Sequence, residues 1–176
     1  PTTEAFGLVV AEALARNLGI RLLSLPITPI FDAFRAVLRS AFAAGPGSAE
    51  LAQQNLQSRI RGTLLMALSN KEGSLLLSTG NKSELSVGYC TLYGDMSGGL
   101  AVLADLPKRS VYELARWLNR EGDLIPQASI DKEPSAELKP NQKDQDDLPP
   151  YDVVDAVLED YIERRLEAAE IARRHS

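Results

Sequence analysis

The residues best suited to chemistry gather in the run LLLSTGNKSELSVGYCTLYGDMSGG, which spans positions 75–99. Within it, the tetrapeptide Ser78 to Asn81 follows an aliphatic segment, at the point where a strand would pass its chain to a helix. Free backbone N–H groups at such a helix start point toward phosphate oxygens, so this turn could hold a phosphate or a ribose. Asn81 could equally be an ordinary N-cap, because Glu84 completes a capping box that needs no ligand.

Other polar side chains could bind ligands, and each also has an ordinary structural explanation. Glu84 could give a carboxylate oxygen to a Mg²⁺ ion shared with phosphates. Asn55 and Arg59 share a helical face, where an amide and a guanidinium can recognise a ribose or a carboxylate, although a solvated polar stripe has the same pattern. Lys108 precedes a helix start that suits phosphate, but most such lysines are simply solvated. Ser135 lies in a proline-stiffened turn that suggests a lid or an ordinary disordered connection.

Two reactive side chains are not assigned any chemistry. Cys90 has no histidine near it in the sequence and is expected to behave as a small hydrophobic residue. His175 lies beside the carboxyl end, where a frayed terminus explains it better than a catalytic base. No residue of this chain is therefore predicted to be catalytic.

Composition limits the class of protein. The chain has 176 residues, 44% of them hydrophobic, which suits one domain over residues 1–176. Its net charge is −5 and its basic residues are scattered, so a nucleic-acid partner is not expected. No apolar stretch approaches the roughly 20 residues of a membrane span, and a single cysteine suits a reducing compartment. We expect a soluble cytoplasmic protein.

The elements that must position these groups alternate between helices and short aliphatic segments. This order predicts an α/β fold with a doubly wound parallel sheet. A polar stretch after Ile125 predicts a loop to Pro150 that is mobile without ligand. The other expected elements are helices at Leu8–Leu18, Thr28–Phe42, Ala49–Ser69 and Val111–Asn119, a helix in two pieces at Tyr151–Arg174, buried strands at Arg21–Ile27 and Ser74–Ser78, and a turn at Ala43–Ser48.

Four sequence blocks together resemble NAD⁺ synthetase, most closely the synthetase domain of the glutamine-dependent type. They are NLQSRIRG (55–62), STGNKSELSVGYCTLYGDMSGG (78–99), LPKRSVYELA (106–115) and KEPSAELKPNQKDQDDLPPYD (132–152). The resemblance implies part of an adenine-nucleotide α-hydrolase-like fold, also called the ATP pyrophosphatase fold. Smaller, ammonia-only members have a lysine where this chain has Leu92, which favours the glutamine-dependent branch.

The resemblance also implies a reaction. Such a ligase uses ATP and Mg²⁺ to adenylate the nicotinate carboxylate of deamido-NAD⁺, and ammonia then displaces AMP to complete NAD⁺ biosynthesis. In the glutamine-dependent type a nitrilase-like glutaminase domain supplies the ammonia. The family further implies a homodimer or a higher homo-oligomer.

The same resemblance assigns the site residues. Thr79, Lys108 and Ser135 would contact ATP, with residues 131–150 as a mobile loop over that site. Glu84 would lie between the substrate and Mg²⁺, in one hollow with Thr79. The residues implied to bind deamido-NAD⁺ are Asn55, Arg59, Glu84, Tyr93 and Asp95.

The chain also departs from the family pattern. The Ser-Gly-Gly-Xaa-Asp-Ser phosphate loop and the glutaminase domain are not in these residues, so we expect an incomplete synthetase domain that is inactive alone. One alternative is a non-catalytic binding or oligomerisation module derived from this domain. Another amidating pyrophosphatase of the same fold is a third possibility, which the block at residues 132–146 disfavours.

Overall fold

The computed structural model describes residues 3–43 and 49–175, so most of the turn expected at Ala43–Ser48 lies outside the described residues. The chain divides into two compact units, each of which is described by itself. Unit 1 comprises Pro1–Leu23, Asn81–Gly88 and Asp105–Ser176, and unit 2 comprises Ser24–Gly80 and Tyr89–Ala104. The expectation of one domain over the whole chain stays a prediction.

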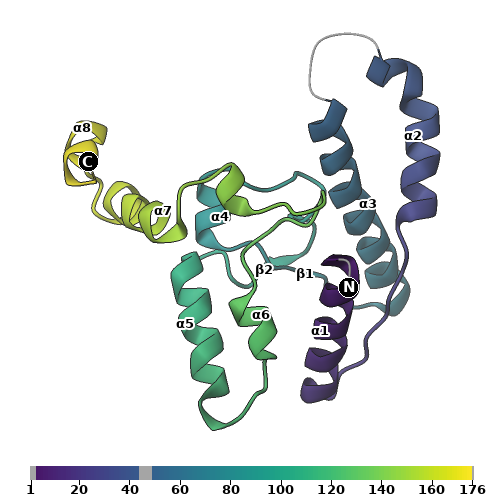
Figure 1. The fold of residues 1–176 in the computed structure, drawn as a ribbon, viewed down its shortest axis with the longest axis horizontal. Coiled ribbons are helices and arrows are strands. Elements are labelled where there is room, and N and C mark those ends of the chain that lie inside the picture. The colour runs from purple at the N-terminus through teal and green to yellow at the C-terminus, as the bar shows by residue number, and fades with distance from the viewer. Residues whose placement is uncertain (1–2, 44–48, 176) are drawn as a thin grey trace. The chain divides into compact units, whose positions relative to one another are not determined.

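Unit 2 is built on a pair of long helices beside a small parallel sheet. α2 (Thr28–Ala43) begins with a Thr-Pro pair that suits the first helical turn, and it packs along α3 (Ala49–Glu72) (Figure 1). The strands β1 (Leu77–Ser78) and β2 (Leu100–Ala101) pair in parallel, with Leu77 opposite Leu100. Both long helices and the parallel direction of the sheet confirm the sequence expectations.

The sheet is much smaller than the sequence suggested. The strand expected at Ser74–Ser78 is reduced to two residues, and Leu77 is exposed instead of covered on both faces. The buried strand expected at Arg21–Ile27 is wrong, because this segment forms no strand and its leucines are about half exposed. An aliphatic run indicates a strand only when a partner strand pairs with it, and the described sheet holds β1 and β2 alone.

Unit 1 is helical. Its three central helices, α4, α5 and α7, pack against one another (Figure 1). The elements of this unit are α1 (Thr3–Leu18), α4 (Lys82–Ser86), α5 (Lys108–Leu118), the 3₁₀ turn η1 (Asn119–Glu121), α6 (Gln127–Asp131), the 3₁₀ turn η2 (Asp144–Asp146), α7 (Tyr151–Leu158), the π-helical turn η3 (Glu159–Glu163) and α8 (Ala168–Arg174).

Most helices of unit 1 follow the sequence pattern. Gly19 ends α1 with a φ of +63°, a conformation that glycine adopts without steric cost. The segment Tyr151–Arg174 is helical in two pieces, as expected, because α8 follows η3 after a short break. The loop expected from Ile125 to Pro150 is wrong in part, since it contains α6 and η2. None of the helices in the described ranges is long and apolar enough to cross a membrane.

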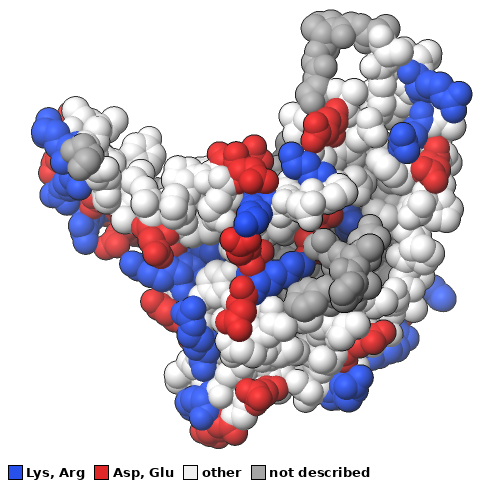
Figure 2. Space-filling view, in the orientation of Figure 1, with Lys and Arg blue, Asp and Glu red and all other residues white. Residues whose placement is uncertain are grey.

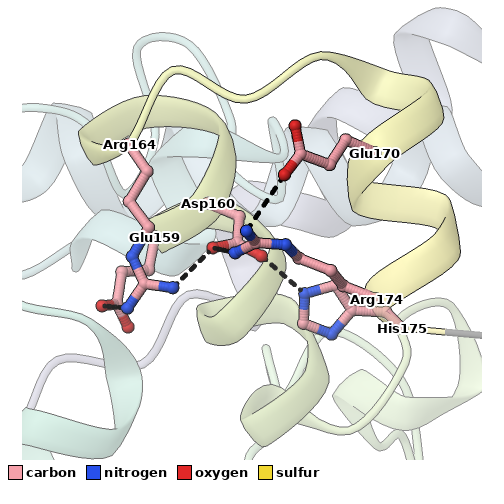
Figure 3. Close-up of polar contacts among 6 residues, drawn as sticks. All are labelled: Glu159, Asp160, Arg164, Glu170, Arg174 and His175. Carbon is pink, nitrogen blue, oxygen red and sulfur yellow. Dashed lines mark hydrogen bonds and ion pairs between the residues drawn. The ribbon is translucent and has the colours of Figure 1, made fainter.

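A cluster of charged residues connects η3 and α8 at the end of unit 1. The carboxylate of Asp160, in η3, accepts hydrogen bonds from Arg164 at 2.9 Å and from Arg174 at 3.4 Å, and lies 3.1 Å from Nε2 of His175 (Figure 3). Burial raises the pKa of Asp160, but His175, Arg174 and Arg164 together outweigh that effect and hold the pKa below its ordinary value. The expectation that His175 belongs to a frayed end is therefore wrong.

Candidate functional site

The start of α4 shows how the polar turn after β1 is built. Asn81 has extended backbone angles, its side chain accepts a hydrogen bond from the N–H of Glu84 at 3.0 Å, and Glu84 Oε2 accepts one from the N–H of Asn81 at 3.1 Å. These reciprocal bonds are the capping box that the sequence offered as the ligand-free explanation. Thr79 is exposed and belongs to unit 2, whereas Glu84 belongs to unit 1. The shared hollow for these two side chains stays a prediction.

Glu84 also forms an ion pair within unit 1. Lys108, the first residue of α5, places its ammonium 2.7 Å from Glu84 Oε1, and the two side chains are only 17% and 20% exposed. The same ammonium lies 5.2 Å from the centre of the Tyr151 ring, a position that favours a cation. A cation held at the start of a helix, with little water around it, can bind phosphate strongly once its carboxylate partner is replaced.

The described residues fit Mg²⁺ in one limited way. No three His, Cys, Asp or Glu side chains of residues 3–43 and 49–175 gather into a metal-binding group. Glu84 is therefore a single carboxylate, and both of its oxygens already accept hydrogen bonds. This suits an ion that takes most of its ligands from phosphates and water, which is how Mg²⁺ is commonly bound beside nucleotides.

Four of the residues predicted to bind deamido-NAD⁺ lie in unit 2, where α3 meets the segment 91–95. Thr91 donates its hydroxyl to Oδ1 of Asn55 at 3.0 Å. Asp95 Oδ1 accepts from the N–H of Thr91 at 2.7 Å, and its own N–H donates to Ser58 Oγ at 3.0 Å. Asn55 and Asp95 are thus held in one network by Thr91. The sequence reasoning missed Ser58 and Thr91, because nothing local marks their contacts across more than 30 residues.

The other two residues of this group lie on the same segment. Arg59 donates from Nε to the carbonyl of Leu92 at 3.1 Å. Tyr93 is 82% exposed and has a φ of +63°, a left-handed conformation that is uncommon for a side chain of this size. The structure therefore brings Asn55, Arg59, Tyr93 and Asp95 together in unit 2.

A close approach of two backbones sets the position of this segment. A Cβ added to Gly62 of α3 would lie 2.8 Å from the carbonyl oxygen of Tyr93, and one added to Gly94 would lie 2.2 Å from Ser58 Oγ. Such distances are shorter than side chains tolerate, so only glycine fits at both positions. The two glycines allow the segment to lie directly on α3.

Ser135 lies in unit 1, in the segment between α6 and η2. Its hydroxyl accepts a hydrogen bond from the N–H of Glu137 at 3.0 Å, which forms a local turn. The far end of this segment is tied to α7, since the hydroxyl of Tyr151 donates to Oδ2 of the buried Asp144 at 2.7 Å. The segment thereby contacts the residue whose ring faces Lys108, while a contact of Ser135 itself with ATP stays a prediction.

The chemistry of these clusters indicates a class of protein. A parallel strand pair, a capped polar turn and a lysine at a helix start are the parts from which α/β proteins build nucleotide sites. Charges of both signs are interspersed over the face shown in Figure 2, which differs from the single-sign basic surface typical of nucleic-acid binding. These features are typical of an α/β protein.

Comparison with known proteins gives the family. The family model described as NAD synthase matches residues 3–176. A glutamine-dependent NAD(+) synthetase from Synechocystis sp. is 58% identical over 161 residues, which are 92% of this chain and 28% of that protein. The chain belongs to the NAD synthase family. It spans less than a third of the length of the curated relatives that it matches.

Solved structures support the fold. The glutamine-dependent NAD⁺ synthetase from Acinetobacter baumannii in complex with ADP superposes with a TM-score of 0.67 at 46% identity, covering 95% of this chain and 29% of that one. NMN synthetase from Francisella tularensis superposes with a TM-score of 0.77 at 27% identity, covering 96% of this chain and 65% of that one. The expected fold class is confirmed, with a small parallel sheet that is consistent with part of that fold.

Proposed function

We propose that the natural chain containing these residues is a glutamine-dependent NAD⁺ synthetase of the cytoplasm. It would adenylate deamido-NAD⁺ with ATP and then amidate the product with ammonia released from glutamine. The identity of 58% to a relative of that name carries the proposal, and the ADP complex of a 46% identical relative supports an adenine nucleotide as ligand. By the family pattern the protein would form a homodimer or a higher homo-oligomer.

In this proposal most residues that bind each ligand lie in one unit; the exceptions are Thr79, an ATP residue in unit 2, and Glu84, a deamido-NAD⁺ residue in unit 1. In unit 2, Asn55, Arg59, Tyr93 and Asp95 would bind deamido-NAD⁺, and the network through Thr91 would hold the amide and the carboxylate ready for hydroxyl groups of a ribose. In unit 1, Lys108 would bind phosphate. Thr79 and Ser135 would contribute further contacts to ATP, with residues 131–150 closing over it as a mobile loop.

The Glu84–Lys108 ion pair fits this division. Phosphate oxygens would attract the ammonium of Lys108 and free Oε1 of Glu84, which lies 2.7 Å from that ammonium in the ion pair. Glu84 would then be the residue that holds Mg²⁺, and the bound ion would neutralise the charge that develops on the phosphates. The capping box keeps the other oxygen of Glu84 fixed throughout.

Product formation tests the proposal. The natural chain that contains these residues should form NAD⁺ from deamido-NAD⁺, ATP and Mg²⁺, with either ammonia or glutamine as the nitrogen source. Nicotinate mononucleotide is the matched control substrate, because one structural relative is named NMN synthetase. Preferential formation of the amidated mononucleotide would contradict the proposed substrate, and activity with ammonia but none with glutamine would contradict the proposed nitrogen source.

A second experiment addresses the alternative of an oligomerisation module without catalysis. Calorimetry of the 176-residue chain with ATP and with deamido-NAD⁺ should show heat for at least one ligand if the residues bind as proposed. A chain that sediments as an oligomer and gives no heat with either nucleotide would favour an assembly module.

A further inference from the structure

α5 begins at the residue proposed to bind phosphate, yet it has no cap of its own. Its N-cap is Pro107, which makes no side-chain hydrogen bond to the helix. The first N–H groups of a helix have no partner within the helix, and burying them without one is costly. The groups of Lys108 and Arg109 must therefore find partners elsewhere.

Two buried side chains from other helices supply these partners. The N–H of Lys108 donates to Ser83 Oγ of α4 at 2.8 Å, and the N–H of Arg109 donates to Asp155 Oδ2 of α7 at 2.9 Å. The hydroxyl of Ser83 in turn donates to Asp155 Oδ1. Ser83 is fully buried and Asp155 is 3% exposed, so water does not compete for these bonds. One carboxylate thus ties α4, α5 and α7 together at the start of α5.

The short helix α4 also positions the Glu84 carboxylate, which pairs with Lys108. Ser83 and Glu84 are adjacent in α4, and the capping box fixes that helix at Asn81. Ser83 holds the backbone of Lys108 while Glu84 holds its ammonium, at 2.7 Å. A lysine side chain is flexible, and its reach toward a phosphate depends on where its backbone is anchored. The anchor in this protein is the Ser83–Asp155 pair.

We propose that Ser83 and Asp155 are positioning residues, which set the first turn of α5 and thereby the place of the Lys108 ammonium in the ATP site. The inference rests on the proposed function only for the identity of the ligand. Neither residue would touch ATP. They would instead hold the start of α5 against α4 and α7, and so fix the position of the Lys108 backbone from which the ammonium extends.

Kinetics of Asp155 variants in the natural chain test this inference. Asp155→Ala removes both acceptors, and we expect the KM for ATP to rise about tenfold, in line with the loss of a buried hydrogen-bond network, while the KM for deamido-NAD⁺ changes little. Asp155→Asn is the conservative variant, because its amide oxygen can accept from Arg109 and its NH₂ can donate to Ser83. It should restore most of the ATP affinity.

The matched control is Val154→Ala, a neighbouring buried position on α7 whose side chain has no hydrogen-bonding group. It should lower thermal stability through lost packing without a selective change in the KM for ATP. Equal effects of Asp155→Ala and Val154→Ala on that KM, or no rescue by Asp155→Asn, would overturn the inference.

A readout without substrate separates the two proposals. Hydrogen exchange of the amides of Lys108 and Arg109 should accelerate in Asp155→Ala and stay slow in Val154→Ala. If the wild-type chain forms no NAD⁺ but this difference is present, the proposed function fails while the positioning role stands. If the two variants exchange alike in an active enzyme, the positioning role fails alone.

Discussion

Glu84 combines a structural role with a proposed functional one. One of its oxygens completes the capping box of α4 and the other pairs with Lys108. A single substitution therefore disturbs two different contacts, and variants of different chemistry are needed to separate them.

Replacing Glu84 by Gln and by Ala separates the cap from the charge. Glu84→Gln keeps an acceptor for the N–H of Asn81 but leaves the largely buried ammonium of Lys108 without its carboxylate, so the free energy of unfolding should fall by about 1–3 kcal/mol. The Mg²⁺ concentration for half-maximal activity should rise by at least about tenfold, the range seen for residues around metal sites. Denaturant unfolding and a Mg²⁺ titration of NAD⁺ formation measure the two effects.

Glu84→Ala serves as the comparison. It also removes the capping bond, which should cost about 0.5–1 kcal/mol more in stability than Glu84→Gln. Equal stability of the two variants would show that the cap contributes nothing, and an unchanged Mg²⁺ requirement in both would remove Glu84 from the metal site.

Contacts of individual residues differ in how far the sequence can predict them. The capping box of Asn81 and Glu84 was predictable, because both partners lie within one helical turn. The contact between Ser83 and Asp155 joins residues 72 positions apart, and each looks like an ordinary polar residue in its own helix. The roles of Asn55, Arg59 and the other site residues came from the family resemblance, because their individual types allow several explanations.

At the scale of elements, the contact between α3 and the segment 91–95 depends on glycine. Gly62→Ala should lower the free energy of unfolding by about 1–3 kcal/mol, because the added methyl group meets backbone oxygens below 3.0 Å that cannot rotate away. The same change in an open helix position raises stability. Denaturant unfolding should therefore show a loss of stability, whereas a glycine-to-alanine change in a helix usually gives a gain.

Gly7→Ala in α1 is the matched control. Among the described residues, a Cβ at Gly7 would meet only Glu137 Oε2 at 3.7 Å, an ordinary contact, so this variant should gain about 0.5–1 kcal/mol. A stabilising Gly62→Ala would show that α3 and the segment do not approach as closely as described.

The charged cluster around Asp160 gives the attachment of α8 a pH dependence. Since the folded pKa of this carboxyl is lowered, its ion pairs stabilise the fold fully above the unfolded value of 3.8 and less as the pH falls through the lowered pKa. We expect amide exchange of α8 to accelerate below about pH 4, beyond the intrinsic pH dependence of exchange, and before that of α5.

Asp160→Asn provides the control for this pH effect. Its α8 should already exchange faster at neutral pH and should show no further step in the acid range. An unchanged exchange rate in the variant would mean that packing of the buried Ile171, and not the charge cluster, holds α8 in place.

Elements were predictable where the signal is local. The long helices and the break before α8 follow from apolar spacing and from caps such as Gly19. β2 was missed because it has only two residues and follows two glycines, and the segment Arg21–Ile27 was assigned wrongly because pairing depends on distant residues. Short helices such as α6 were not predicted, because they lie in a polar, proline-containing stretch.

At the scale of the whole molecule, the proposal places most deamido-NAD⁺ residues in unit 2 and most ATP residues in unit 1, with Glu84 and Thr79 as the exceptions. Deamido-NAD⁺ should slow amide exchange in α3 and in residues 89–97, and ATP with Mg²⁺ should slow it in α4 and at the start of α5. Hydrogen exchange of the natural chain with each ligand alone measures this pattern. Protection of α3 by ATP with Mg²⁺, or of the start of α5 by deamido-NAD⁺, would contradict this assignment of the site residues to the units.

The left-handed backbone at Tyr93 has one more consequence. An aromatic residue held there costs on the order of 1 kcal/mol, and its ring gains almost no burial in return, being 82% exposed. Stability alone would favour glycine or asparagine at position 93, because both adopt this backbone conformation at a lower cost. Under the proposed function, a bound nucleotide would cover the Tyr93 ring and offset this cost with contacts that the polypeptide does not supply.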